Sequence, residues 1–325
     1  MKKIPAMLLM ALSALPRVAM AACECGYAAN STDTREVYTD LIETDFTKVI
    51  SIEHNTDWIR QEFNKSDKNA RGPLGEKFMV TNVAAVHESA PPNGLGSDAG
   101  LRLVVKGSKY HNDTQEIDME FLTREFNASN GTYPLNIVLQ SRASLDNGYN
   151  AQGTGNFLKV SLGFNPTTDF HEYRIDYLRD EVVFYADNKA IGRMNGSAVP
   201  TEGGHLILQH WSNGNPLWSG GPPKQDAVLM VGSARAYFNS SLGSRKADHA
   251  RRCVDPSVPD AICTIPDDRS FFFATHANMT MNQTVSGQPT YGEDDGGVSG
   301  RGSASAEVPL WTLLMGVFAL GLWLV

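Results

Sequence analysis

A short stretch of the chain alternates acidic with apolar residues, and its residue types could carry out chemistry. It reads Glu116-Ile117-Asp118-Met119-Glu120-Phe121. In a β-strand successive side chains point to opposite faces, so one face of this strand would carry three carboxylates and the other three apolar groups. We expect the apolar face to pack into a core and the acidic face to line a groove.

Like charges held side by side repel, and a stable fold has no structural reason to gather them. Such a cluster favours a state in which one carboxyl group keeps its proton beside an ionised neighbour. An acid next to a carboxylate is what cleavage of a glycosidic bond requires. A solvated strand face and a metal site are the alternatives that the motif by itself leaves open.

The acidic stretch resembles the active-site strand of glycoside hydrolase family 16, the group of laminarinases, lichenases and fungal cell-wall transglycosylases. His205–Trp211 is similar to the family's late strand that ends in a sugar-binding Trp, and Trp218–Gly221 to its Trp-Ala-Gly-Gly segment. Phe170–Tyr177 and Val182–Asp187 resemble the paired strands ahead of that Trp. The likeness covers roughly residues 45–239.

The resemblance implies that Glu116 is the nucleophile and Glu120 the acid/base, with Asp118 assisting between them. It also implies a concanavalin A-like jelly-roll sandwich of two antiparallel sheets, a β-glucan-type polysaccharide as substrate, and no cofactor. Retaining cleavage needs the two carboxyl groups about 5–5.5 Å apart. Residues four apart on an extended strand are separated by about 13 Å, so the two Glu side chains must lean together on a concave, twisted sheet.

Sugars bind by stacking on aromatic rings and by hydrogen bonding through their hydroxyl groups. We expect ring platforms and polar partners at Trp211, Trp218, Tyr149, Gln209, His210 and Asn213. Water as the acceptor would make the protein a hydrolase, and a sugar hydroxyl would make it a transglycosylase.

Two other classes of protein stay open. A lectin can use the same sandwich architecture without catalysis, and lectins of this shape often bind Ca²⁺ through oxygen ligands. A structural Ca²⁺ therefore stays open too, although the sequence shows no ligand set for it. A structural wall glycoprotein is the third class, but it would leave the acidic strand without an explanation.

The elements that must position these residues are short and β-like. Apolar and β-branched runs, divided by Gly, Asn, Pro and Asp, predict strands at Leu101–Val105, Leu135–Leu139, Phe157–Leu162, Tyr173–Tyr177, Val182–Ala186 and Leu206–Trp211. No long stretch has a helical period, which favours an all-β sandwich. One such domain, together with its flanking cysteine segments, would occupy residues 22–265.

Both ends of the chain carry targeting patterns. Residues 1–21 have the charged start, apolar run and Ala19-Met20-Ala21 ending of a secretory signal. Residues 266–302 have the composition of a flexible stalk rich in Ser, Gly and Asp. Residues 303–325 are apolar with no following Lys or Arg, which is typical of a glycosylphosphatidylinositol attachment signal. A single-pass membrane tail is the alternative for this last segment.

The cysteines lie in two pairs at the two ends of the predicted domain. Cys23 and Cys25 are too close in sequence to bond each other well, and a secreted chain favours disulfides. We therefore expect two bridges between this pair and the pair formed by Cys253 and Cys263. A zinc site is the competing interpretation, but no His is directly adjacent in sequence to any of these cysteines.

The overall charge limits the possible partners. A formal net charge of -8 argues against nucleic acid and against electrostatic binding to anionic lipid. A neutral polysaccharide suits this charge, and we expect membrane contact only through the C-terminal lipid anchor. Several Asn-x-Ser/Thr sites agree with a secreted glycoprotein at the cell surface or in the cell wall. We expect a monomer.

Overall fold

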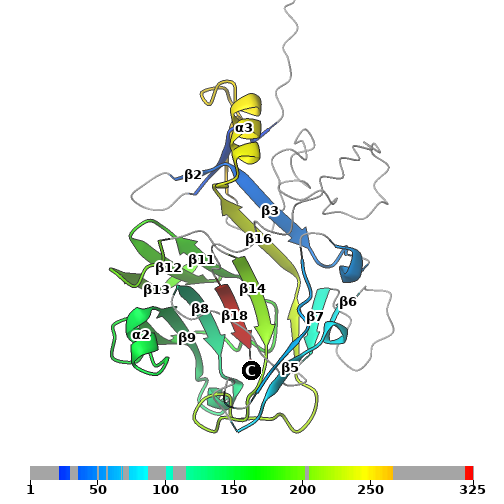
Figure 1. Cartoon of the computed structure of the whole chain (residues 1–325), viewed down its shortest axis with the longest axis vertical. Helices are drawn as coiled ribbons and strands as arrows, with labels where there is room; N and C mark the ends of the chain where they lie inside the picture. The colour runs from blue at the N-terminus through cyan, green and yellow to red at the C-terminus, as the bar shows by residue number, and fades with distance from the viewer. Residues whose placement is uncertain are drawn as a thin grey trace, which may run out of the picture.

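The computed structural model describes residues 22–29, 36–49, 51–55, 58–66, 68, 73–86, 100–104, 115–201, 205–265 and 319–324. Within these ranges most ordered residues belong to β-strands in antiparallel sheets, and helices are few (Figure 1). The predicted all-β class is therefore confirmed. The signal sequence, the stalk and most of the C-terminal segment lie outside the described residues.

The central sheet carries the acidic stretch. Its strands, in spatial order, are β10 (Phe157–Leu162), β9 (Tyr133–Gln140), β8 (Glu116–Phe121), β18 (Ala319–Leu324) and β14 (His205–His210). Strands β8, β9 and β10 pair antiparallel, whereas β18 is parallel to both β8 and β14. Part of the segment expected to be an anchor signal thus lies in the sheet beside the acidic strand.

A second sheet packs against the central one. It consists of β11 (Tyr173–Tyr177), β12 (Glu181–Ala186) and β13 (Lys189–Asn195). The side chains between the two sheets form the largest apolar cluster, which includes Ile117, Met119, Phe121, Leu135, Ile137, Leu139, Val182 and Phe184. The sheets approach closely at Gly192, where a Cβ would lie 2.2 Å from Ile137 Cδ1.

The aromatic rings of this core are arranged edge to face. Phe121 meets Tyr173 at a centroid distance of 5.0 Å and Phe126 at 6.4 Å. Such pairs add stabilisation to that gained from burying their apolar surface.

Burial raises the pKa of the Tyr173 phenol, and the charge of Asp187 adds to the effect, so the hydroxyl stays protonated at ordinary pH.

The remaining strands and helices extend the domain around these layers. Smaller sheets are formed by β6 (Val83–Val86), β7 (Gly100–Val104) and β15 (Val228–Val231), by β3 (Asp40–Asp45) with β16 (Ser233–Phe238), and by β4 (Phe63–Lys65) with β5 (Glu76–Phe78). The helical elements are α2 (Arg142–Asp146), α3 (Gly243–Arg252) and the short 3-10 turns η1 (Ile52–His54), η2 (Val80–Asn82) and η3 (Thr123–Glu125). Helix α3 is one of the elements that the sequence pattern missed.

The two ends of the domain meet in a small module that we call the terminal clasp. It comprises β1 (Gly26–Ala28), β2 (Val37–Tyr38), α3 and β17 (Ile262–Thr264), and β1 pairs with both other strands. Disulfides join Cys23 to Cys263 and Cys25 to Cys253, which confirms the predicted pairing of the two ends. Figure 1 shows α3 at one end of the molecule, away from β8 and β9.

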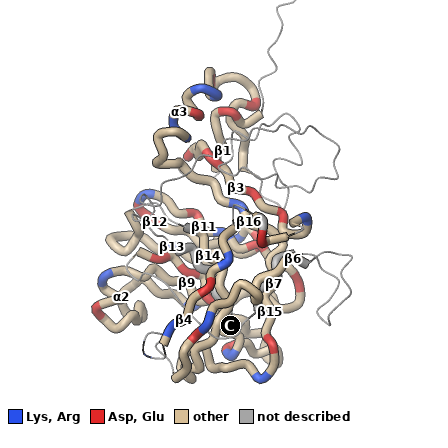
Figure 2. The backbone as a smooth tube through the Cα atoms, turned by 45° about the vertical axis from the view of Figure 1, so that its right-hand side comes forward, with Lys and Arg blue, Asp and Glu red and all other residues tan. Residues whose placement is uncertain are grey.

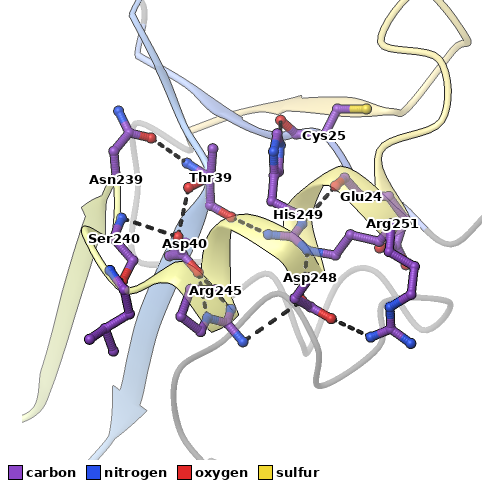
Figure 3. A network of polar contacts seen from close by, with 12 residues as sticks. Glu24, Cys25, Thr39, Asp40, Asn239, Ser240, Arg245, Asp248, His249 and Arg251 are labelled. Atoms are coloured by element: carbon purple, nitrogen blue, oxygen red, sulfur yellow. Dashed lines mark hydrogen bonds and ion pairs between the residues drawn. The ribbon is translucent and has the colours of Figure 1, made fainter.

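Arginine side chains of α3 tie the clasp together (Figure 3). Arg245 donates to Asp40 Oδ1 from Nε and Nη2, at 2.9 and 2.6 Å, and Asp40 is only 1% exposed. Arg252 donates to the carbonyl oxygens of Glu24 and Thr39, at 2.6 and 2.5 Å. One face of α3 therefore holds both the N-terminal segment and the start of β3.

Charged residues of both signs are interspersed along the described chain, including on α3 (Figure 2). No helix among the described ranges is long and apolar enough to cross a membrane.

Candidate active site

Strand β8 shows the alternation that the sequence predicts. Ile117, Met119 and Phe121 lie in the core between the two sheets, at most 2% exposed. The three carboxylates are on the other face, with exposures of 3% for Glu116, 0% for Asp118 and 8% for Glu120. Burying carboxylates side by side is costly unless each is paired or neutral, so packing alone does not account for them.

Two amide side chains of β9 lie directly opposite the two glutamates. Asn136 pairs in register with Glu120, and Gln140 pairs with Glu116. Residues opposite each other on neighbouring strands share a face, so both amides belong to the carboxylate face. Asn136 is fully buried, and neither its Oδ1 nor its Nδ2 has a hydrogen-bond partner within the described part of the chain.

A buried amide without a partner costs about 1–3 kcal/mol, so Asn136 is suited to a partner that arrives with a ligand. Gln140 Oε1 is likewise buried without a hydrogen-bond partner among the described residues. A donor and acceptor beside each glutamate can hold the hydroxyl groups of a sugar. We infer that the polar face of this sheet contains two amides in addition to the predicted carboxylates.

Strand β14 brings one of its predicted residues to the same face. Through β18, Gln209 is in register with Glu120, and two strand spacings put their backbones about 10 Å apart. His210 follows and points to the opposite side, where Leu208 packs on the cluster formed by Phe46 and Leu229. The structure therefore gathers Gln209 with the carboxylates and does not gather His210.

The predicted aromatic platforms lie at two ends of β8. Trp211 and Trp218 are partly buried and lie near the Glu120 end, because β14 runs parallel to β8 and the Trp218 loop contacts Arg124 beyond β8. Tyr149 lies toward the Glu116 end, in the segment after α2, where its backbone N–H donates to Ser144 O at 2.7 Å.

Asn213 orders the Trp218 loop from within. It is 3% exposed, and its Oδ1 accepts from Asn215 N at 2.9 Å and from Ser219 Oγ at 2.8 Å. Its carbonyl accepts from Leu74 N at 3.1 Å. Among the predicted sugar-binding residues, Asn213 thus has a role in shaping the loop itself.

The described ranges offer no side-chain cluster for a metal ion. They hold no group of three or more His, Cys, Asp or Glu residues arranged to bind a metal ion. All four cysteines are in disulfides, which excludes the zinc alternative for them.

Residues 87–226 match the family model for glycosyl hydrolases family 16. The match includes β8, β9, β14 and Trp218, which are the elements that build the carboxylate face and its Glu120 end. The comparison supports a glycosyl hydrolase family 16 domain in this chain.

Two plant proteins from Arabidopsis thaliana are similar in sequence. Xyloglucan endotransglucosylase/hydrolase protein 31 is 28% identical over 166 residues, covering 50% of this chain and 53% of the relative. Probable xyloglucan endotransglucosylase/hydrolase protein 27 is 27% identical over 118 residues, covering 35% of this chain and 31% of the relative. The chain thus spans about half or less of these relatives. No solved structure matches the chain significantly.

Sequence reasoning missed Asn136, Gln140 and Arg124. The two amides had a signal, because Leu135, Ile137 and Leu139 alternate with them at the spacing of a half-buried strand. Arg124 had none, since its partners lie more than ninety residues later in the chain.

Proposed function

We propose that the protein is a retaining, endo-acting glycoside hydrolase or transglycosylase that cleaves β-glucan-type polysaccharide. The observation that carries this proposal is the carboxylate face of β8, where Glu116 and Glu120 flank Asp118 and each glutamate faces an amide of β9. The family match over residues 87–226 supports the same class of reaction.

In the proposed reaction Glu120 donates a proton to the glycosidic oxygen while the Glu116 carboxylate attacks the anomeric carbon. The bond from that carbon to the leaving oxygen breaks, and a glycosyl–enzyme ester forms. Glu120, now ionised, removes a proton from the acceptor, whose oxygen then displaces Glu116. Asp118 lies between the two glutamates on the same face of β8. In the proposed reaction it assists both by acting on their charge as the proton moves.

The acceptor is water in a hydrolase and a sugar hydroxyl in a transglycosylase. The names of both plant relatives join these two activities and name xyloglucan as the polymer. Xyloglucan therefore belongs among the test polymers beside β-1,3-glucan, mixed-linkage glucan and chitin oligosaccharides.

The same proposal includes a place in the cell. A secretory signal, two disulfides and a C-terminal attachment pattern support a lipid-anchored protein at the cell surface or wall. Removal of the C-terminal segment would take β18 out from between β8 and β14. Mass spectrometry of the mature protein's two ends tests this part, and an intact C-terminal segment on the surface protein would reject lipid anchoring.

Activity is tested by incubating the purified full chain, and the naturally processed form, with each labelled polymer. The comparison variant is Glu116→Gln, which keeps the size of the side chain and removes its charge. Glu181→Gln is the matched control, because Glu181 pairs with Arg193 at 2.5 Å on the second sheet, which packs on the apolar face of β8 and not on its carboxylate face. We expect Glu116→Gln to lose at least about 10³-fold in kcat, and Glu181→Gln to match the wild type.

The products identify the reaction. Shorter chains from one polymer indicate hydrolysis of that linkage, and longer or hybrid chains indicate transfer. Binding of a polymer without turnover, equal in wild type and Glu116→Gln, would replace the enzyme proposal with a lectin.

A further inference from the structure

Arg124 joins the end of the acidic strand to the loop that carries Trp218. It lies in η3, directly after β8, and its Nη2 donates to Leu217 O at 2.6 Å. Its Nε donates to the carbonyl oxygen of Trp218. Two neighbouring carbonyl groups of one loop are thus bound by one planar guanidinium group, which has its donors in a fixed fork.

The loop is built to receive this side chain. Gly220 has a φ of +70°, and a Cβ at this position would lie 2.7 Å from Arg124 Cδ. A side chain at residue 220 would therefore displace the stem of Arg124. On its other side Arg124 meets Glu125 Oε1 at 3.4 Å, and Glu125 is in turn held by Lys159 of β10 at 2.8 Å.

The loop is also ordered from within, by hydrogen bonds among its own residues. Asn215 O accepts from Trp218 N at 3.1 Å and from Gly220 N at 2.8 Å, while Asn215 Oδ1 accepts from Leu217 N at 2.9 Å. These bonds give the loop its shape and do not attach it to β8. Arg124 supplies two hydrogen bonds that attach the loop to the turn after β8.

The attached tip presents apolar side chains to solvent. Leu217 is 82% exposed and Trp218 is partly exposed. Holding such residues in a fixed position is useful where a ligand must contact them, because a preordered surface loses less conformational entropy on binding. The tip lies at the Glu120 end of β8, the end of the carboxyl group that serves as proton donor in the proposed reaction.

We propose that Arg124 is a positioning residue that fixes the Leu217–Trp218 tip as the contact surface for the sugar unit next to Glu120. That unit departs with the leaving oxygen in the first step and is the acceptor in the second when a sugar takes the place of water. The inference rests on the proposed function. It adds the residue that positions the sugar-contacting tip at the Glu120 end of β8.

The test compares Arg124→Ala, Arg124→Lys and Lys159→Ala in the full chain. Lys159→Ala removes the ion pair with Glu125 and leaves the bonds to both carbonyl groups, so it is the matched control. Hydrogen exchange of the peptide 213–222 reports the attachment of the loop without any substrate, and exchange of β9 reports whether the central sheet is intact. Steady-state kinetics report KM, kcat and the ratio of transfer to hydrolysis.

We expect Arg124→Ala to speed exchange of the 213–222 peptide about tenfold and to raise KM about tenfold, with kcat of hydrolysis within about threefold and β9 unchanged. Transfer to a sugar acceptor should fall relative to hydrolysis. Arg124→Lys should lie between Ala and wild type, because an ammonium group cannot reproduce the fork, and Lys159→Ala should match wild type.

Unchanged exchange in Arg124→Ala would overturn the proposal, as would a loss of kcat without a change in KM. If Arg124→Ala also speeds hydrogen exchange of β9, the central sheet is disturbed and Arg124→Lys becomes the deciding variant. Unchanged exchange of the 213–222 peptide, or a loss of kcat without a change in KM, would then overturn the proposal in Arg124→Lys. Faster loop exchange in a protein that turns over none of the polymers would reject the proposed function and the sugar-binding role together, while leaving the attachment itself established.

Discussion

Strand β8 and the terminal clasp are held in place by different kinds of interaction. Behind the carboxylates, β8 rests on a continuous apolar layer shared by two sheets, with Phe121 between Phe126 and Tyr173. The clasp has a small apolar cluster around Tyr27 and Leu41, and adds two disulfides and buried arginine contacts. A strand in the middle of a domain can bury one whole face, whereas chain ends bury little and need cross-links.

The comparison predicts where the domain is most sensitive. Changes behind β8 should disturb stability and the carboxylate face together. Changes in the clasp should lower the free energy of unfolding while leaving the chemistry of the folded protein intact, because α3 lies away from β8 (Figure 1).

The largest effect on stability is expected from removing both disulfides. One bridge closes a loop of more than two hundred residues, which the chain-entropy account values at about 5 kcal/mol. The second then closes only a short loop of roughly fifteen residues, worth about 3 kcal/mol. Replacing Cys25 and Cys253 by Ser should therefore cost about 3 kcal/mol, and replacing all four cysteines clearly more.

Urea unfolding of the two variants beside the wild type measures this difference. Equal losses for the double and the quadruple variant would show that the Cys23–Cys263 bridge contributes nothing of its own. Activity per folded molecule should stay at the wild-type level in the double variant.

A smaller loss, of both stability and activity, is expected behind the carboxylates. Phe121→Ala empties a fully buried site between two aromatic neighbours and should cost about 3–5 kcal/mol. Because β8 would shift into the space, kcat should fall as well. Leu158→Ala on β10 is the control, since Leu158 is 41% exposed and should change the stability by less than about 1 kcal/mol.

Urea unfolding and the glucan assay together test this point. A Phe121→Ala protein that loses stability but keeps full kcat would show that the position of the carboxylates does not depend on the core behind β8. The contrast drawn between β8 and the clasp would then be wrong.

The smallest effect is expected from the ionic part of the clasp. Arg245→Met leaves the carboxylate of Asp40 buried without its main partner and should cost about 2 kcal/mol, since Arg245 retains some contact with water. Adding Asp40→Asn removes the stranded charge and should restore part of the loss. A double variant no more stable than Arg245→Met would mean that the charge of Asp40 is solvated without Arg245.

Much of the central domain follows from patterns of period two in the sequence. The predicted runs at Phe157–Leu162 and Tyr173–Tyr177 coincide with β10 and β11, and the alternation in β8 gives the correct buried face. Such strands are predictable because each has one apolar and one polar face, which a sequence shows directly. The cysteine pairing was predictable for a different reason, namely that Cys23 and Cys25 are too close in sequence to bond each other well and so need partners from elsewhere in the chain.

Contacts between distant segments were not predictable in this way. Helix α3 carries few apolar residues, and its arginines bind backbone carbonyl groups that any sequence would supply. Arg124 is bound in the same manner, by the carbonyl groups of Leu217 and Trp218. Every residue type has a main-chain carbonyl group, so a sequence does not show which of these groups accepts a hydrogen bond from a distant arginine. The structure is needed to find such contacts.

The two bridges also order events during synthesis of the chain. Cys23 and Cys25 leave the ribosome first, and their partners follow 240 and 228 residues later. At about 5–20 residues per second, the first cysteines wait on the order of ten seconds or longer for their partners to be made. The central sheet has time to assemble from β8, β9 and β10 in that interval, whereas β1 must wait for β17. Closure of the clasp therefore marks a chain translated through its whole domain, and a truncated product would keep its first two thiols exposed.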